Sequence, residues 1–159
     1  MSDQSITRVQ RRLSELGLSL PAAPRPVAAY VPFVRSGNIV YVSGQVPFFE
    51  GKLLFSGPVP SRVSLDDARS AARQCVLNGL AVVSDALDGD LDRIKRIVRL
   101  GVFVCSDAGF TEQPKVSNGA SELLQEIFGE AGRHARSAVG SIALPLGATV
   151  EVEMTVEVV

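Results

Sequence analysis

The C-terminal stretch from Gly132 to Val159 contains residue types whose spacing could serve chemistry. Arg136 has a planar guanidinium, which can hold a carboxylate through two parallel hydrogen bonds. Further along, acidic and apolar residues alternate with a period of two, which predicts a half-buried strand from Ala148 to the C-terminus. The carboxylates of its polar face are Glu151, Glu153 and Glu157.

Two interpretations of this acidic face are open. The carboxylates are simply solvated, or Arg136 meets one of them beside a ligand. Arg136 lies near the start of a second predicted strand, about Ala135–Ala143, and the turn Leu144–Gly147 joins the two strands as partners. From the residues alone, an ion pair between Arg136 and Glu151 or Glu153 at the strand end is the simpler expectation.

The same stretch resembles a known family. The matching segments, in order, are Arg136-Ser137-Ala138-Val139, Leu144-Pro145 and Val150-Glu151-Val152-Glu153. They are similar to the closing motif of the YjgF/RidA (reactive-intermediate deaminase) family, and Ser43–Pro47 is similar to its Ser-Gly-Gln-hydrophobic-Pro segment. The resemblance covers most of Tyr30–Val159 and implies the fold more firmly than the activity, because one fold hosts many functions.

The resemblance implies a set of site residues. In the family, the arginine at the place of Arg136 binds the substrate carboxylate, and the glutamate at the place of Glu151 orients or activates water. Tyr30 matches the aromatic residue that closes the cleft from the first strand. Ser43 and Asn118 match polar positions near it. Taken singly, a strand Tyr, a strand-end Ser and a helix Asn are more often structural than ligand-binding.

The chain also departs from the family pattern. The deaminase branch commonly has Cys two residues after the arginine, where this chain has Ala138. A backbone carbonyl at Ala138 could still hold a water molecule, but no thiol is available there. One extra residue lies between Asn118 and Arg136, and a predicted N-terminal helix is added. These differences indicate a divergent branch of the family.

The first part of the chain is predicted to be a helix and a stiff connector. Apolar residues recur at helical spacing from about Ser5 to Leu16, and Gly17 is the expected stop. Three prolines follow, at positions 21, 24 and 26. We therefore divide the chain into residues 1–29, the helix with its Pro-rich lead-in, and residues 30–159, a YjgF/RidA-like domain.

The remaining elements follow from periodicity and from helix-ending residues. They are a hairpin around Ser36–Asn38, a helix capped by Ser64 and ended by Gly89, a strand within Ile94–Ser106, and a helix from Pro114 to Gly129. The strand is apolar enough for both of its faces to be largely covered. With the two C-terminal strands, the order is β-β-α-β-α-β-β.

This order predicts an α+β fold, a mixed β-sheet with two helices packed on one face, of the YjgF/RidA-like (chorismate-mutase-like) kind. Helices that cover one face leave the other in need of water or a partner, and Phe33, Tyr41 and Phe103 are expected to add apolar surface there. The resemblance supplies the form of the assembly, a homotrimer with ligand clefts between subunits.

Composition argues against several classes of protein. The formal net charge of −1 does not point to nucleic acid or to an anionic membrane. Cys75 and Cys105 are expected to be buried, reduced thiols, which is typical of a cytoplasmic protein. His134 is the one histidine and Ser137 has no visible catalytic partners, so neither a metal site nor a serine nucleophile is expected. With no apparent leader or spanning segment, we expect a soluble, cytoplasmic protein that binds no membrane and needs no cofactor.

The leading functional hypothesis is hydrolytic deamination of small enamines or imines that carry a carboxylate, giving keto acids and ammonia. Arg136 would anchor the carboxylate, Glu151 would position water, and Tyr30 would help to enclose the substrate. One alternative is a non-catalytic module that binds a small carboxylate as a regulator. Another is an endoribonuclease, which the near-neutral charge and single histidine disfavour.

Overall fold

The central strand of the sheet is β7 (Val150–Val158), in which buried and half-buried side chains alternate without a break. The computed structural model describes residues 6–25 and 29–159 of the chain. The five even-numbered residues of β7 are buried and belong to the hydrophobic core. The intervening residues, Glu151 to Glu157 in steps of two, are half-buried on the opposite face, which we call the open face. The predicted alternation is confirmed.

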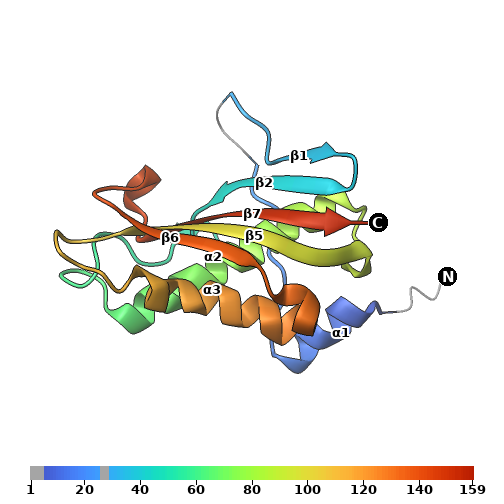
Figure 1. The fold of residues 1–159 in the computed structure, drawn as a ribbon, viewed down its shortest axis with the longest axis horizontal. Helices are drawn as coiled ribbons and strands as arrows, with labels where there is room; N and C mark the ends of the chain where they lie inside the picture. The colour runs from blue at the N-terminus through green and yellow to red at the C-terminus, as the bar shows by residue number, and fades with distance from the viewer. Residues whose placement is uncertain (1–5, 26–28) are drawn as a thin grey trace.

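Four more strands complete a five-stranded sheet in the order β1-β2-β7-β5-β6 (Figure 1). Their bounds are β1 (Phe33–Ser36), β2 (Ile39–Gln45), β5 (Ile94–Cys105) and β6 (Ala135–Ser141). All neighbours are antiparallel except β5 and β6, which run parallel. Two short strands, β3 (Phe48–Phe49) and β4 (Lys52–Leu53), pair with each other in a separate hairpin.

One sequence prediction about the sheet was wrong, because β6 and β7 are not partners. Strand β5 lies between them and pairs with both. The reason is the connection from β5 to β6, which passes through a helix; such a crossover places the second strand parallel to the first. The segment between β6 and β7 contains a short 3-10 helix, η3 (Pro145–Gly147), and returns the chain to the far side of β5.

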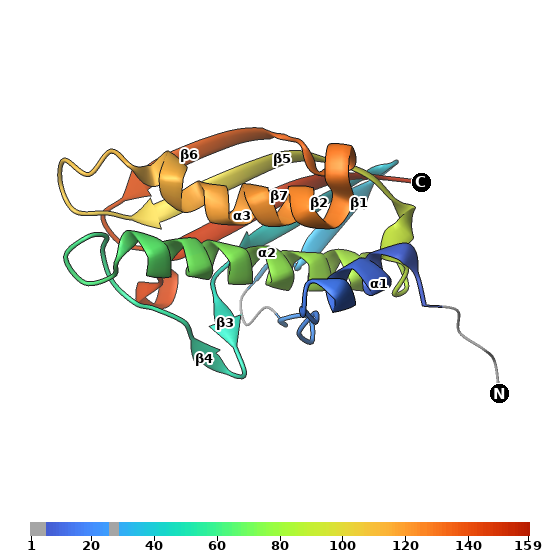
Figure 2. The same cartoon turned by 90° about the horizontal axis from the view of Figure 1, so that it is seen from below.

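Two long helices cover one face of the sheet, as predicted: α2 (Leu65–Ala86) and α3 (Gln113–Phe128) (Figures 1 and 2). The Ser64 hydroxyl caps α2 by accepting the Asp67 N–H at 3.1 Å. A Cβ atom added at Gly79 would lie 2.7 Å from the Met154 methyl carbon, so the small residue lets α2 lie close to the sheet. Gly129 ends α3 with φ 60°.

A third helix, α1 (Arg8–Glu15), joins the same core. Thr7 accepts the Gln10 N–H as its N-cap, and Asp92 accepts the N–H groups of Arg8 and Val9. Val9 and Leu13 are buried, whereas Ile6 is exposed and does not contribute to the predicted apolar stripe. The predicted helix start at Ser5 and the third proline of the connector, Pro26, lie outside the described residues.

The bounds of the two remaining 3-10 helices are η1 (Leu91–Arg93) and η2 (Gly129–Gly132). Both cysteines are buried and free, as predicted. Among residues 6–25 and 29–159, no helix combines the length and apolarity that a membrane span requires.

The open face of the sheet carries apolar side chains in the single chain. Tyr41 and Val139 are exposed and Phe103 is half-buried, so β5 is covered on one face only. The assignment of Phe33 to this face was wrong. Phe33 pairs with the buried Val42 and packs on the core, because directly opposite residues in a sheet share a face.

Candidate functional site

Arg136 lies at the start of the edge strand β6, with its guanidinium directed toward α3. One terminal nitrogen, Nη1, donates to Asn118 Oδ1 at 2.9 Å and to Ser121 Oγ at 3.0 Å. The other, Nη2, donates to the carbonyl oxygen of Pro114 at 3.4 Å. Three neutral oxygens therefore hold the guanidinium in place. Its Nε–H and one Nη2–H remain without a hydrogen-bond partner in the described part of the chain.

Arg136 lacks a carboxylate partner among the described residues, which distinguishes it from most of the other arginines there. Arg69, Arg99 and Arg133, for example, each pair with a glutamate. Across residues 6–25 and 29–159, no carboxylate oxygen lies within salt-bridge distance of Arg136. The expected ion pair with Glu151 or Glu153 was therefore wrong in the single chain. Partial burial lowers the pKa of Arg136, yet arginine stays protonated at neutral pH.

A hydrogen-bonded pair, Ser121 and His134, supports the arginine, and sequence reasoning missed its role. His134 Nδ1 lies 2.6 Å from the Gly132 carbonyl oxygen, so Nδ1 carries the hydrogen. The Ser121 hydroxyl must then donate to His134 Nε2, 2.9 Å away, while its oxygen accepts from Arg136. The signal was available: Ser121 lies three residues after Asn118 on a helix, and such residues are neighbours.

These side chains form one wall of an open pocket of about 600 Å³, the Arg136 pocket. Its lining residues are Asn118, Ser121, Gln125, Arg133, His134 and Arg136. The pKa of His134 is lowered, mainly by burial and to a smaller degree by the charge of Arg136, while its bond to Gly132 opposes the shift. A neutral imidazole adds no positive charge to the pocket, whose two cations are Arg136 and Arg133, the latter paired with Glu130.

The predicted residues Tyr30 and Glu151 line a different cavity, of about 310 Å³, which we call the Glu151 cavity. The pairing of β2 with β7 shifts register between Val42 and Gln45, so Ser43 and Gly44 form a bulge beside Glu151. A Cβ atom added at Gly44 would lie 2.1 Å from Glu151 Oε1. Glycine at this position thus leaves room for the carboxylate in the place it occupies, and any larger residue would require Glu151 to shift.

The Glu151 carboxyl has an altered acidity. Burial raises the pKa of Glu151, and the neighbouring Glu153 raises it further. Glu153 itself pairs with Arg99 at 3.2 Å, and Glu157 pairs with Lys95 at 2.8 Å. Glu157 also lines a pocket, but of the three carboxylates on the acidic face Glu151 is the one without a cationic partner among the described residues.

The other predicted site residues take supporting or peripheral places. Ser43 donates its hydroxyl to the Val31 carbonyl at 2.7 Å, and its N–H to the Pro32 carbonyl at 3.0 Å. It thereby fixes the segment that carries Tyr30, but it does not line the Glu151 cavity. Ala138 lies opposite Val102, on the same face of β6 as Arg136, and lines neither pocket.

The register places the two groups of residues on opposite faces of the sheet. Arg136 is opposite Leu100, which is opposite Met154, and these two are buried beneath the helices. Glu151 is opposite Phe103, which is opposite Val139 on the open face. Arg136 with Asn118 and Glu151 with Tyr30 thus form two separate groups in one chain, which we call the Arg136 half-site and the Glu151 half-site.

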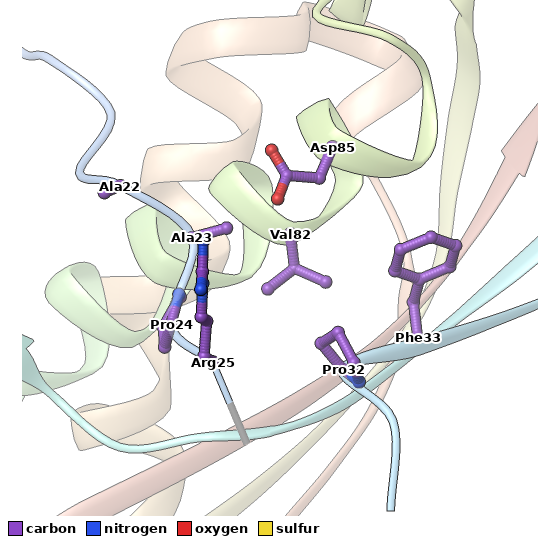
Figure 3. Close-up of a pocket in the computed structure, with 8 residues that line it drawn as sticks. All are labelled: Ala22, Ala23, Pro24, Arg25, Pro32, Phe33, Val82 and Asp85. Carbon is purple, nitrogen blue, oxygen red and sulfur yellow. The ribbon is translucent and has the colours of Figure 1, made fainter. Parts of the chain in front are cut away.

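No group of three or more His, Cys, Asp or Glu side chains within the described residues could hold a metal ion. A further cavity of about 350 Å³ lies where the lead-in segment passes α2, and contains no predicted site residue. Figure 3 shows Asp85 and Val82 directed into it from α2, with Arg25 on the lead-in and Phe33 at the start of β1.

Comparison with known proteins identifies the family. The model of the family described as "YjgF/chorismate mutase-like, putative endoribonuclease" matches residues 10–158. The chain belongs to this family. The predicted family and fold class are therefore confirmed, and the match begins inside α1, at its third residue.

Three proteins similar to this chain have different names. Protein TCP17 of Trypanosoma cruzi is 46% identical over 99% of this chain and 98% of its own length. A 2-iminobutanoate/2-iminopropanoate deaminase of Dermatophagoides farinae is 30% identical over 87% of this chain and 93% of its own. The crystal structure of a protein of unknown function from Agrobacterium tumefaciens has a TM-score of 0.90 at 47% identity, with 96% of this chain and 93% of that one covered.

Proposed function

We propose that this YjgF protein deaminates small enamines or imines that carry a carboxylate, by hydrolysis. The observation that carries the proposal is that Arg136 is held by hydrogen bonds but, among the described residues, keeps two N–H groups free for a ligand. Its guanidinium is held by the neutral oxygens of Asn118, Ser121 and Pro114, with no carboxylate beside it in the described part of the chain. Its remaining Nε–H and Nη2–H can bind a substrate carboxylate. The deaminase from Dermatophagoides farinae is a relative with this kind of activity in its name.

Glu151 supplies the proton transfer in this scheme. The carbon attacked is that of the protonated imine. The Glu151 carboxylate accepts a proton from water as the water oxygen forms a bond to this carbon, and the C=N electron pair moves to nitrogen, which is left as a neutral amine. The same carboxyl group then returns the proton to that nitrogen. As the carbon–nitrogen bond breaks and ammonia leaves, the new hydroxyl group gives its proton to the Glu151 carboxylate and becomes the carbonyl group of the keto acid. A raised pKa suits this role, since a stronger base takes the proton more readily and the acid form is accessible at the next step.

A complete site in this scheme requires two chains. The Arg136 half-site and the Glu151 half-site of one chain face opposite sides of the sheet, so a single chain does not bring them together. The open face carries Tyr41, Val139 and Phe103, an apolar surface that a second copy can cover. The assembly we propose is a homotrimer in which each cleft combines Arg136 of one subunit with Tyr30 and Glu151 of the next.

The shared cleft has a direct test. Light scattering at micromolar concentration should give the mass of three chains. Mixed trimers made from Arg136→Ala and Tyr30→Ala chains should regain part of the wild-type activity, because some clefts then combine the intact residues. A fully active monomer, or mixtures no more active than either parent, would contradict the model.

The activity itself is tested with 2-iminopropanoate generated in situ. Faster loss of the imine than in buffer, with one ammonia released per keto acid, is the expected result. Saturable binding of pyruvate without any turnover would instead favour the second candidate, a carboxylate-binding module, because Arg136 alone can hold the ligand. Incubation with a labelled RNA serves as the control for the endoribonuclease name of the family, and we expect no cleavage.

A further inference from the structure

A separate cavity of about 670 Å³ lies on the outer side of α2, between the lead-in segment and the β3–β4 hairpin. Figure 2 shows the hairpin projecting past α2 on the side opposite α3. Leu18 and Pro21 contribute from the lead-in, Phe48 and Phe49 from the hairpin, and Leu77 from α2. We call it the Gln74 cavity, after the polar residue on its helical wall.

Two buried amides on this wall determine what the cavity offers. Asn78 is 1% exposed, and its Nδ2 donates to the carbonyl oxygens of Val46 and Phe48, both at 3.0 Å. Both amide hydrogens are used, so the orientation of Asn78 is fixed and its Oδ1 must accept. Gln74 Nε2 donates to that oxygen at 2.9 Å. The orientation of Gln74 is therefore fixed as well.

With Gln74 Nε2 bound to Asn78, the other end of the Gln74 amide, Oε1, is an acceptor that no donor meets among the described residues. Gln74 is 8% exposed and lines the cavity, and its Oε1 has no hydrogen-bond partner within residues 6–25 and 29–159. No side-chain polar atom among the described residues is both fully buried and without a partner, so this oxygen is open to the space of the cavity, where water or a ligand donor can reach it. The one charged residue in the lining is Glu50, which is exposed at the rim and also accepts, and the exposed Ser19 adds a hydroxyl group. On its helical wall, the cavity thus presents a fixed acceptor among apolar side chains.

We infer that the Gln74 cavity binds a small, mainly apolar molecule that carries an N–H or O–H donor, with that donor on Gln74 Oε1. A volume of this size is within the range of small-molecule sites, which combine apolar walls with a few fixed polar groups. Glu50 at the rim disfavours anions, so the ligand differs in class from the carboxylate proposed for Arg136. The cavity shares Pro24 and Phe48 with the Glu151 cavity but contains no residue of either half-site.

The test uses a matched pair of probes and reads binding directly, independent of any deaminase activity. Indole has a flat apolar body with one N–H donor, and 1-methylindole lacks the donor. Chemical-shift titrations of the full-length protein should show saturable binding of indole, with 1-methylindole about two- to tenfold weaker, the range expected for one net hydrogen bond.

Two variants assign the difference to this cavity. Ala22→Trp adds bulk at an exposed position of the lining, touches no hydrogen bond named above, and should abolish indole binding. Gln74→Met should remove the preference for indole over 1-methylindole, with a thermal melt to confirm folding. Gln125→Met, an exposed glutamine on α3, is the control and should preserve the preference.

Three results would overturn the inference. They are equal affinities of the wild-type protein for the two probes, no saturation by indole up to its solubility limit, and unchanged indole binding in Ala22→Trp. None of these depends on whether the protein turns over an imine, so the inference and the proposed function fail separately.

Discussion

The two half-sites hold their charged groups in different ways. Arg136 is fixed by three neutral oxygens from α3 at the sheet edge, so its position depends on a hydrogen-bond network. Glu151 has no such network among the described residues; it fits into space left by Gly44 and stands near a second carboxylate, Glu153. Hydrogen bonds thus position the arginine, whereas the glutamate occupies space that is open because Gly44 has no side chain. Different substitutions should therefore disrupt the two half-sites.

Arg136→Ala should have the largest effect. Removing the guanidinium removes the carboxylate anchor, and we expect kcat/KM for 2-iminopropanoate to fall by about a hundredfold or more, since a charged hydrogen-bonded pair is worth several kcal/mol when its geometry is good. Arg136→Lys should restore little, because lysine has no planar fork. Arg133→Ala, in the same pocket but paired with Glu130, is the matched control and should keep most of the activity. An unimpaired Arg136→Ala protein would remove the basis of the proposed function.

Glu151→Gln should lower turnover and spare binding. The amide is nearly the same size but cannot take a proton from water, so we expect kcat to fall by about a hundredfold, the low end for a general base, with little change in pyruvate affinity. Glu157→Gln is the control, because Glu157 shares the open face but pairs with Lys95. Steady-state rates and a pyruvate titration of both variants make the comparison. Equal losses in the two variants would argue against a special role for Glu151.

Gly44→Ala tests whether open space positions Glu151. The new Cβ would lie 2.1 Å from Glu151 Oε1, so the carboxylate must move. A displacement of about an ångström can cost up to a hundredfold in rate, and we expect a loss of about ten- to a hundredfold with pyruvate binding retained. Gly101→Ala makes a similar clash, 2.5 Å from Glu153 Oε1, and should change the rate far less. Equal losses of rate in Gly44→Ala and Gly101→Ala would show that turnover does not depend on the exact position of the Glu151 carboxylate.

The contrast also explains what the sequence could predict. Periodicity is a local signal, so the strand β7, the Ser64 cap and Gly129 at the end of α3 were accessible from the residues. The end of α2 was placed less well, since the helix stops at Ala86, before the predicted Gly89. The adjacency of β6 and β7 was not, because strand order depends on contacts between distant segments. Phe33 was placed on the wrong face for the same reason: a face depends on register, which the partner strand sets.

The prediction of site residues was limited in the same way, because their surroundings depend on distant segments of the chain. Arg136 and Glu151 were selected by family resemblance, which names positions but not the face on which they lie. The support from Ser121 and His134 was missed because a lone histidine was tested only as a metal ligand. Its bonds depend on the path of η2, which brings the Gly132 carbonyl to Nδ1. Gly44 falls in the Ser43–Pro47 motif, but the motif did not reveal its role, which arises from a bulge opposite β7.

The smallest expected effect concerns His134 and the pH dependence of stability. The pKa of His134 is lowered in the folded protein, mainly by burial, so the unfolded chain binds more protons as the pH falls below the ordinary histidine value of about 6.5. The contribution of His134 to stability is therefore lost as the pH falls from about 6.5 toward its lowered value in the folded protein. Protonation also places a hydrogen on Nε2 against the Ser121 hydroxyl and a second positive charge beside Arg136.

Because His134 is the only histidine, the wild type and His134→Gln differ at this one titrating group. We expect the wild-type melting temperature to fall by about 1 to 2 °C more than that of the variant between pH 7.5 and 5.5, at equal chain concentration. The figure follows from about 2 to 4 °C per kcal/mol for a domain of this size, reduced because solvent reaches part of the ring. The contrary result is a melting temperature that falls as much in the variant as in the wild type, or more. It would show that His134 is protonated as easily in the folded protein as in the unfolded chain, and that the position of Arg136 does not depend on the charge of His134.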